Sequence, residues 1–154
     1  MKVAEVAECY AKHSDALVRF AATQVGPDHA DDIVSAAVIG ALRASTADVV
    51  DVRAYLYTSV ANAARKHWRS LDRRTRRERL VARADMFEQR EPDVTFAAAL
   101  GRLSPQQRAI IHLTYWDDLT PAMVAVRLSV SDGTVRRQLA RARRRLKEVL
   151  DDDR

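Results

Sequence analysis

The sequence predicts an all-α protein made of two small helical domains joined by a charged linker, and three observations carry that prediction. The chain has 154 residues but only four glycines and four prolines, which leaves long stretches without helix breakers. Alanine, leucine and arginine dominate these stretches, and their apolar residues recur at three- and four-residue spacing. Between Arg65 and Arg79, eight bases stand against two acids and the apolar pattern thins. We therefore expect one domain at residues 1–70 and a second at 96–150. A linker at 71–95, which can be partly helical, joins them, and an acidic tail follows at 151–154.

The composition excludes several classes of protein. A net charge of +5, with 47% hydrophobic and 31% charged residues, fits a folded chain and argues against wholesale disorder. No apolar run approaches the roughly twenty residues that span a bilayer, and the first residues lack the form of a signal peptide. The single Cys9 allows no internal disulfide, and the four histidines show no spacing typical of metal ligands. We expect a cytoplasmic protein without membrane insertion, catalytic residues, metal ion or cofactor.

The first domain is expected to contain three helices, of which the first two cover residues 3–24 and 28–44. A glycine-proline pair ends the first helix. Asp28 is the expected N-cap of the second, and Asp31 and Asp32 follow in its first turn. Acids there suit the helix dipole, so these two carboxylates have a structural explanation of about the same weight as a binding role.

The third helix carries aromatic residues ahead of a basic run. Tyr55 and Tyr57 stand at helical spacing with apolar neighbours, and such aromatics usually pack in a core. Trp68 differs because Lys66 and Arg69 lie close to it on either side. Aromatic side chains among bases suit a surface that stacks unpaired nucleobases and neutralises phosphates, although this signal alone is weak.

The second domain ends in a pattern typical of a helix-turn-helix. Ser104 and Gln107 form a capping box at the start of an earlier helix. Thr120 can cap a short helix, Ser129-Val130 can form the turn, and Ser131 can cap a second helix. The helix-turn-helix arrangement uses the second helix to read duplex DNA.

The second helix of this motif separates apolar from basic residues. Its apolar positions, spaced by four, three, four and three, are Val135, Leu139, Ala142, Leu146 and Val149. Its other side carries Arg136, Arg137, Arg141 and Arg144, with no acid between Gly133 and Lys147. For an isolated stretch, a solvated face is an equally good explanation. The preceding capped helix and the single sign of charge favour DNA binding.

Several motifs in this order resemble the sigma-70 family of RNA polymerase sigma factors. The second domain resembles region four in the segments Leu103–Arg108, Leu119-Thr120, Val130–Arg136 and Arg141–Leu146. The first domain resembles region two in the segments Ala30–Val34, Ala41-Leu42 and Arg53–Thr58, with Asn62. Nearly the whole chain is covered, and the order and length are similar to the small extracytoplasmic-function type, which has only these two domains.

The resemblance implies partners and a role for each candidate residue. The expected partners are core RNA polymerase, through the clamp helices of its largest subunit and its flap, promoter DNA and, as a further candidate, an anti-sigma factor, with a monomer as the free state. Polymerase contacts are expected at Asp31, Asp32, Ser35 and Ile39. Contacts to the melted minus-ten element are expected at Asn62, Arg65, Lys66, Trp68 and Arg69. Contacts to the minus-thirty-five duplex are expected at Ser131, Thr134, Arg136, Arg137, Arg141 and Arg144.

The chain departs from the family pattern at several positions. Ser35-Ala36 replaces a common polar pair and Gly40 a common arginine, which leaves fewer polar contacts on that helix. Ser129 stands where glycine is common, and Met123 and Val126 replace common acids. A left-handed Ser129 is expected to cost about 1 to 2 kcal/mol.

These observations predict a non-enzymatic initiation factor that directs core polymerase to promoters. Two other classes stay open. One is an autonomous helix-turn-helix regulator, which would bind duplex DNA without polymerase. The other is a degenerate sigma-like interaction protein, which would occupy polymerase without initiating transcription.

Overall fold

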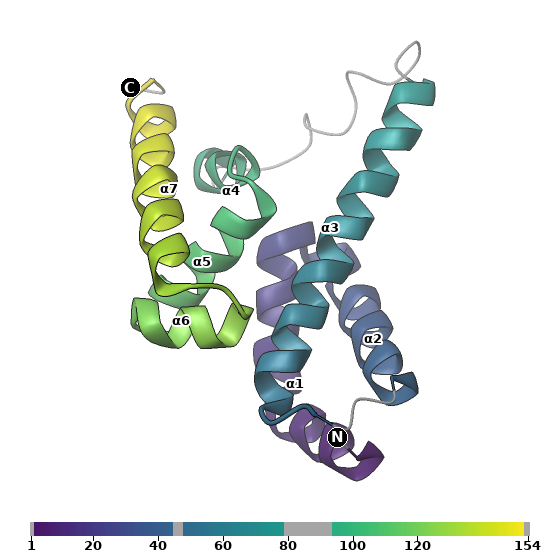
Figure 1. Ribbon diagram of the computed structural model, residues 1–154. Helices are drawn as coiled ribbons and strands as arrows, with labels where there is room; N and C mark the ends of the chain where they lie inside the picture. Colours follow the sequence, from purple (N-terminus) through teal and green to yellow (C-terminus); the bar gives the residue numbers. More distant parts are fainter. Residues whose placement is uncertain (1, 45–47, 79–93, 153–154) are drawn as a thin grey trace.

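The computed structural model describes residues 2–44, 48–78 and 94–152, which form seven α-helices and no strand (Figure 1). The helices are α1 (Val3–Val25), α2 (Pro27–Arg43), α3 (Val52–Glu78), α4 (Val94–Gly101), α5 (Pro105–Tyr115), α6 (Pro121–Leu128) and α7 (Asp132–Asp152). The all-α fold is therefore confirmed. Most of the expected linker, residues 79–93, and residues 153–154 of the expected tail lie outside the described residues. None of the described helices combines the length and apolar character needed to cross a membrane.

The first domain consists of α1, α2 and α3, which pack against one another. A single residue, Gly26, ends α1 and precedes α2, with a positive φ of 86° that glycine adopts without strain. The expectation that Asp28 caps α2 is wrong, because the N-cap is Gly26 and Asp28 lies in the first turn. Pro27 explains the earlier start, since its fixed φ suits the first helical position.

The third helix, α3, extends beyond the aromatic and basic residues on which its prediction is based. α3 continues to Glu78, through the first eight residues of the expected linker. No glycine or proline interrupts this stretch, and arginine and glutamate are good helix formers. In Figure 1 the end of α3 therefore projects beyond α1 and α2.

The second domain consists of α4 to α7, and its caps are the expected ones. Ser104 Oγ accepts from Gln107 N at 3.2 Å while Gln107 Oε1 accepts from Ser104 N at 3.1 Å, which completes the capping box of α5. Thr120 Oγ1 accepts from Met123 N at 3.3 Å at the start of α6. The apolar side of α7 is buried at Val135, Leu139 and Ala142.

The turn between α6 and α7 depends on Ser129. This residue is left-handed, with φ 55° and ψ 44°. The conformation allows Ser129 N to donate to Val126 O at 3.3 Å and Val130 N to donate to Ala125 O at 3.0 Å. These bonds satisfy carbonyls at the end of α6, so the turn keeps its regular geometry at the cost of a strained serine.

The two domains pack directly against each other. We call this contact surface the seam; α1 and α3 form one side of it, and α5 and α6 form the other (Figure 1). Its apolar centre is Phe20 of α1, whose ring centroid lies 5.0 Å from that of Tyr57 in α3 and 5.5 Å from that of His112 in α5. The buried apolar residues of both domains therefore form one continuous core.

Buried polar groups accompany this apolar contact. The Gln24 carbonyl near the end of α1 accepts from Trp68 Nε1 and from Arg108 Nη1, both at 2.8 Å. The Gln24 amide, oriented to satisfy both of its ends, donates to Pro105 O at 2.9 Å and accepts from Ala109 N at 3.0 Å. One buried glutamine thus connects both domains at the first turn of α5.

A second contact joins α3 to α6. The Arg127 guanidinium carbon lies 4.9 Å from the centroid of the Tyr57 ring, within range of a cation–π interaction. Thr58 Oγ1 donates to Arg127 O at 3.4 Å and lies 3.4 Å from Ser129 Oγ. The turn of the helix-turn-helix therefore contacts the first domain.

Replacing Ser129 with glycine is expected to stabilise the protein by about 1 kcal/mol, because glycine adopts the left-handed conformation without strain. Urea unfolding of both proteins measures the gain. Ser131→Gly is the matched control, and it is expected to lose a few tenths of a kcal/mol because Ser131 caps α7. Equal or lower stability of Ser129→Gly would contradict the strain.

Replacing Gln24 with leucine is expected to cost about 1 kcal/mol, because leucine has similar volume but cannot bond to Pro105 or Ala109. The loss should appear in urea unfolding together with faster proteolysis between the domains. Gln138→Leu is the control, since Gln138 bonds to Gln107 within the second domain. A wild-type stability for Gln24→Leu would show that the buried amide contributes nothing to the seam.

Candidate nucleic-acid interface

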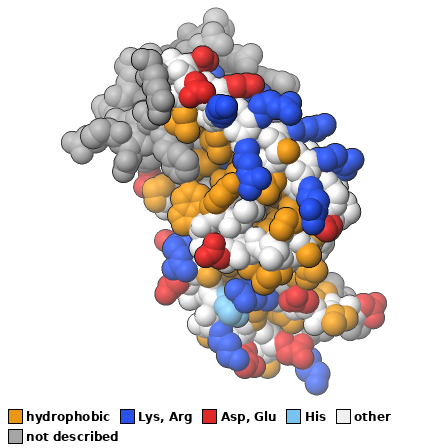
Figure 2. Space-filling model, turned by 90° about the vertical axis from the view of Figure 1, so that its left-hand side faces the viewer, with side chains coloured by type: hydrophobic (Ala, Val, Ile, Leu, Met, Phe, Trp, Pro, Cys, Tyr) orange, Lys and Arg blue, Asp and Glu red, His pale blue; other side chains and the backbone are white. Residues whose placement is uncertain are grey.

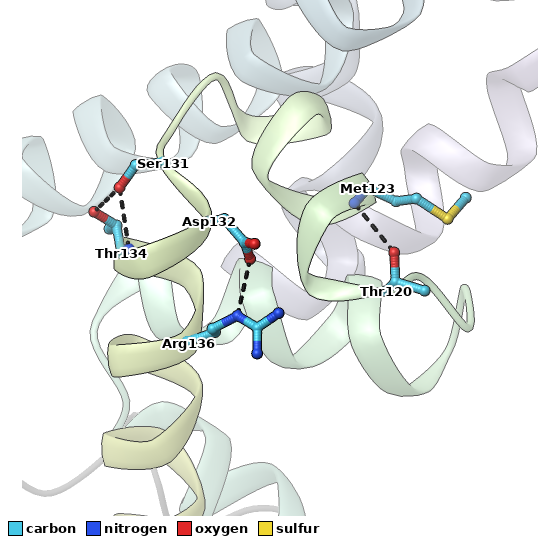
Figure 3. A network of polar contacts seen from close by, with 6 residues as sticks. All are labelled: Thr120, Met123, Ser131, Asp132, Thr134 and Arg136. Atoms are coloured by element: carbon cyan, nitrogen blue, oxygen red, sulfur yellow. Dashed lines mark hydrogen bonds and ion pairs between the residues drawn. The ribbon is translucent and has the colours of Figure 1, made fainter.

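The start of α7 carries a compact polar network (Figure 3). Ser131 Oγ accepts from Thr134 N at 3.1 Å, which caps the helix, and lies 2.8 Å from Thr134 Oγ1. The two hydroxyls sit at the helix N-terminus, where backbone donors and the helix dipole favour anionic groups. This end of α7 can therefore offer hydrogen bonds to nucleic acid.

The candidate arginines of α7 fall on two faces. Arg136 Nε donates to Asp132 Oδ1 at 3.2 Å, so this guanidinium is paired within its own helix (Figure 3). Arg137 Nη2 donates to Thr134 Oγ1 at 3.4 Å. At helical spacing, the side chains that share one face are Thr134, Arg137, Arg141 and Arg144. Five of the six predicted duplex-contacting residues therefore lie at the N-terminus of α7 or on this one face, and Arg136 lies on a different face.

A shallow hollow lies beside this arginine face. It has a volume of about 450 Å³ and is lined by Arg102, Ser104, Gln107, Arg141, Arg144, Arg145 and Glu148. Four guanidinium groups against one carboxylate make it suited to phosphate. Sequence reasoning missed Arg102 and Arg145 here, because only the packing of α4 against α7 brings Arg102 to the arginines of α7.

The basic residues of α3 form a second candidate surface. Exposed side chains at three- and four-residue spacing follow one face of the helix at Asn62, Arg65, Lys66 and Arg69. Trp68 is not on that face. It continues the buried stripe of Ala61 and Ala64, which is directed towards the seam.

Trp68 contacts both domains instead. Its indole nitrogen donates to Gln24 O of the first domain at 2.8 Å, and the guanidinium carbon of Arg108, from the second domain, lies 5.0 Å from the ring centroid. The Trp68 side chain is 37% exposed. One face of the ring is therefore covered by Arg108 in this arrangement.

The candidate polymerase contacts lie on the outer face of α2. Asp31, Asp32 and Ser35 are exposed, and Ile39 is exposed to 47%. Leu42, which sequence reasoning did not single out, is also exposed, to 38%. Acidic, polar and apolar side chains thus share one helix face that no other described helix covers.

The side of α7 away from the arginine hollow carries an apolar groove between α5 and α7. It has a volume of about 660 Å³ and is lined by Ile111, Tyr115, Trp116, Arg143, Leu146, Lys147, Leu150 and Asp151. Arg143 Nε donates to Tyr115 Oη at 2.7 Å across it. Figure 2, which views the molecule from the side of α7, shows exposed hydrophobic side chains with Lys and Arg along one side of them. Such a groove suits an amphipathic helix with acidic flanks.

Comparisons with known proteins agree with the two-domain organisation. Residues 9–74 match the family model for sigma-70 region 2, and residues 94–146 match that for sigma-70 region 4. An RNA polymerase sigma-E factor of Streptomyces avermitilis is 30% identical over 156 aligned positions, which cover 97% of this chain and 87% of the relative. A second sigma-E factor, of Streptomyces antibioticus, is 34% identical over 67 positions, covering 44% of this chain and 37% of that protein.

Two solved structures have the same fold. The sigma factor RpoE of Bartonella quintana, in complex with the anti-sigma factor NepR, superposes with a TM-score of 0.65 at 26% identity and covers 91% of this chain and 92% of its own. CnrH, in complex with the cytosolic domain of CnrY, superposes with a TM-score of 0.65 at 25% identity and covers 97% and 89%. The chain therefore belongs to the extracytoplasmic-function type of the sigma-70 family, whose members are non-enzymatic factors for promoter-directed transcription initiation with RNA polymerase.

Proposed function

We propose that this protein divides promoter recognition between its two domains, with the second domain reading the minus-thirty-five duplex and the first capturing the melted minus-ten element. The observation that carries the proposal is the polarity of α7. One face combines a capped N-terminus with exposed arginines. The other face is apolar, where it packs in the core and lines the groove between α5 and α7.

Duplex reading is assigned to the start and the arginine face of α7. Thr134 and Arg137 are at the end of the helix that enters the major groove in helix-turn-helix proteins, so they are the candidates for base edges. Arg141, Arg144 and the neighbouring Arg102 lie farther along, beside the hollow, and are the candidates for phosphates. Arg136 contributes less, because Asp132 already pairs with it.

Capture of the melted strand is assigned to α3. Asn62, Arg65, Lys66 and Arg69 form a basic strip suited to a single-stranded backbone. Arg108 of the second domain occupies one face of the Trp68 ring. Separation of the two domains would make this face available to a base.

Protein partners are assigned to two further surfaces. The outer face of α2, with Asp31, Asp32, Ser35 and Ile39, is the proposed contact for the clamp helices of the polymerase. The apolar groove between α5 and α7 is the proposed contact for the flap. Because the two solved relatives are bound to NepR and to a domain of CnrY, an anti-sigma factor that competes for these surfaces is part of the proposal.

The rival of an autonomous regulator predicts that the isolated chain binds duplex DNA. The exposed arginine face of α7 is compatible with such binding, so the discriminating test is whether the purified protein binds promoter duplex without polymerase. A degenerate sigma-like interaction protein would bind polymerase without starting transcription. The transcription experiment below distinguishes this alternative from the proposal.

Arg137→Ala is expected to weaken selection of the upstream duplex by about 5-fold to 150-fold, because a base or charge-assisted contact is worth about 1–3 kcal/mol. The measurement is the ratio of holoenzyme binding to promoter fragments with and without the intact upstream element. Lys12→Ala removes a positive charge from α1, outside the proposed DNA and polymerase surfaces, and should leave the ratio unchanged. Equal effects of both variants, or loss of polymerase binding by Arg137→Ala, would contradict the assignment.

Core polymerase supplied with this chain is expected to start transcription at defined sites on genomic promoter fragments. Run-off mapping of the transcripts measures this. The start sites should share an upstream and a downstream element, and Arg65→Ala with Lys66→Ala should reduce open-complex formation, seen by permanganate reactivity, more than closed-complex binding. If the folded chain binds polymerase and yields no specific transcript at any salt concentration, the degenerate rival replaces the proposal.

A further inference from the structure

His112 is a buried histidine of the seam. It projects from α5 towards α1 and is only 2% exposed. The edge of its ring meets Phe20, with centroids 5.5 Å apart, and Trp116 stacks on its face at 5.6 Å with an angle of 9° between the planes. The ring is therefore enclosed by aromatic groups from both domains.

A short hydrogen bond joins the His112 ring to the first domain. Thr23 Oγ1 lies 2.6 Å from His112 Nδ1 and 3.1 Å from Arg19 O. The tautomer of the neutral ring decides whether Nδ1 or the hydroxyl donates in the short contact. In either tautomer this bond crosses the seam from α5 to α1.

The second ring nitrogen has no hydrogen-bond partner. His112 Nε2 is buried, and Asp117 Oδ1, at 3.9 Å, is too far for a hydrogen bond. Asp117 Oδ2 is also buried without a partner. The protonated ring would therefore carry a positive charge in the core with no hydrogen-bond acceptor at Nε2.

We propose that His112 is a proton-sensitive latch between the two domains: the neutral ring holds α1 against α5, and protonation of the ring favours the separated arrangement. Two charged groups act on the ring. The Asp117 carboxylate, in the loop after α5, attracts a protonated ring, and the Arg19 guanidinium, in α1, repels it. Separation of the domains removes α1 from the ring, which gives the imidazolium access to water while Asp117 stays near.

The direction of the pH effect follows from the burial. Burial lowers the pKa of His112 from its ordinary value of 6.5, Asp117 opposes this change, and Arg19 adds to it. In the separated arrangement the pKa returns towards the ordinary value, so the separated form binds the proton more tightly. The contribution of His112 to closure is present in full above about pH 6.5 and is lost as the pH falls through the lower pKa of the closed form.

Opening this latch would release other groups of the seam. Arg108 would leave the Trp68 ring, and Thr58 would leave the turn at Ser129. The inference concerns the free chain alone, so it can hold or fail independently of the proposed DNA and polymerase contacts.

The distance between the domains as a function of pH tests the latch. The full chain with Cys9→Ser receives dyes at Ala36→Cys in α2 and Ala140→Cys in α7, both exposed positions. Energy transfer is expected to fall reversibly between pH 8 and pH 5.5 while helicity by circular dichroism stays constant. Unchanged energy transfer in a folded protein, or a loss of helicity that accompanies the change, would overturn the proposal.

Two variants distinguish His112 from other titrating groups. His112→Phe keeps an aromatic ring against Phe20 and Trp116 but cannot be protonated, so its energy transfer should not depend on pH. His13→Gln is the matched control, since His13 lies in α1 close enough to Arg53 and Arg127 for their charges to lower its pKa along with burial. A response that survives in His112→Phe and disappears in His13→Gln would transfer the latch to His13 and refute ours.

A measurement on the native side chain covers the case in which His112→Phe is unfolded or already open. The C–H signals of the imidazole report protonation of His112 by nuclear magnetic resonance in the otherwise native chain. Protonation is expected to have the same midpoint as the change in energy transfer. Domain separation while His112 is still neutral, or protonation without separation, would each overturn the proposal.

Discussion

The arrangement of the whole protein depends on how the last turn of α1 satisfies its carbonyl groups. The end of a helix leaves carbonyl oxygens without partners and carries a partial negative charge. Here the Gln24 carbonyl receives the indole N–H of Trp68 from the same domain and the guanidinium of Arg108 from the other. A cation at a helix C-terminus is favourable, and this one comes from a different domain. The end of α1 therefore fixes α3 and α5 in place at once, and the contacts of Phe20 and His112 follow one turn earlier.

A seam of this composition suits a reversible contact. Contacts between domains of one chain resemble transient interfaces, which are more polar than obligate ones. Gln24, Arg108 and His112 are all buried, and each of them has a polar group that water could solvate if the domains separated. Burial lowers the pKa of Arg108, yet its guanidinium stays charged, so closing the seam carries a desolvation cost that the hydrogen bond and the Trp68 ring only partly offset. The balance between the two arrangements is thus open to control by partners or protons.

The sequence predicted what depends on local periodicity and capping. The caps at Ser104, Thr120 and Ser131 and the buried stripe of α7 follow from residue type and spacing. The strip from Asn62 to Arg69 came from the family resemblance, and the structure shows that its side chains are exposed. The seam could not be predicted, because its polar members Gln24, Arg108 and His112 stand where a core pattern leads one to expect apolar side chains. The sequence interpretation of Trp68 rests on the bases beside it, whereas its contacts with Gln24 and Arg108 depend on how the helices and domains pack. The arginine hollow needs the packing of α4 on α7, which no sequence spacing encodes, and the site assignments themselves remain proposals.

The geometry separates phosphate binding from base capture. In the closed form the arginine face of α7 and the strip with Arg65, Lys66 and Arg69 are exposed, so long-range attraction to DNA does not require opening. Trp68 alone among the proposed DNA-contacting side chains is engaged across the seam, and stacking on an unpaired base needs its ring face. The closed chain can therefore approach DNA electrostatically while Arg108 occupies one face of the Trp68 ring. Separation of the domains is then coupled to base stacking on that face, because a base and Arg108 compete for it.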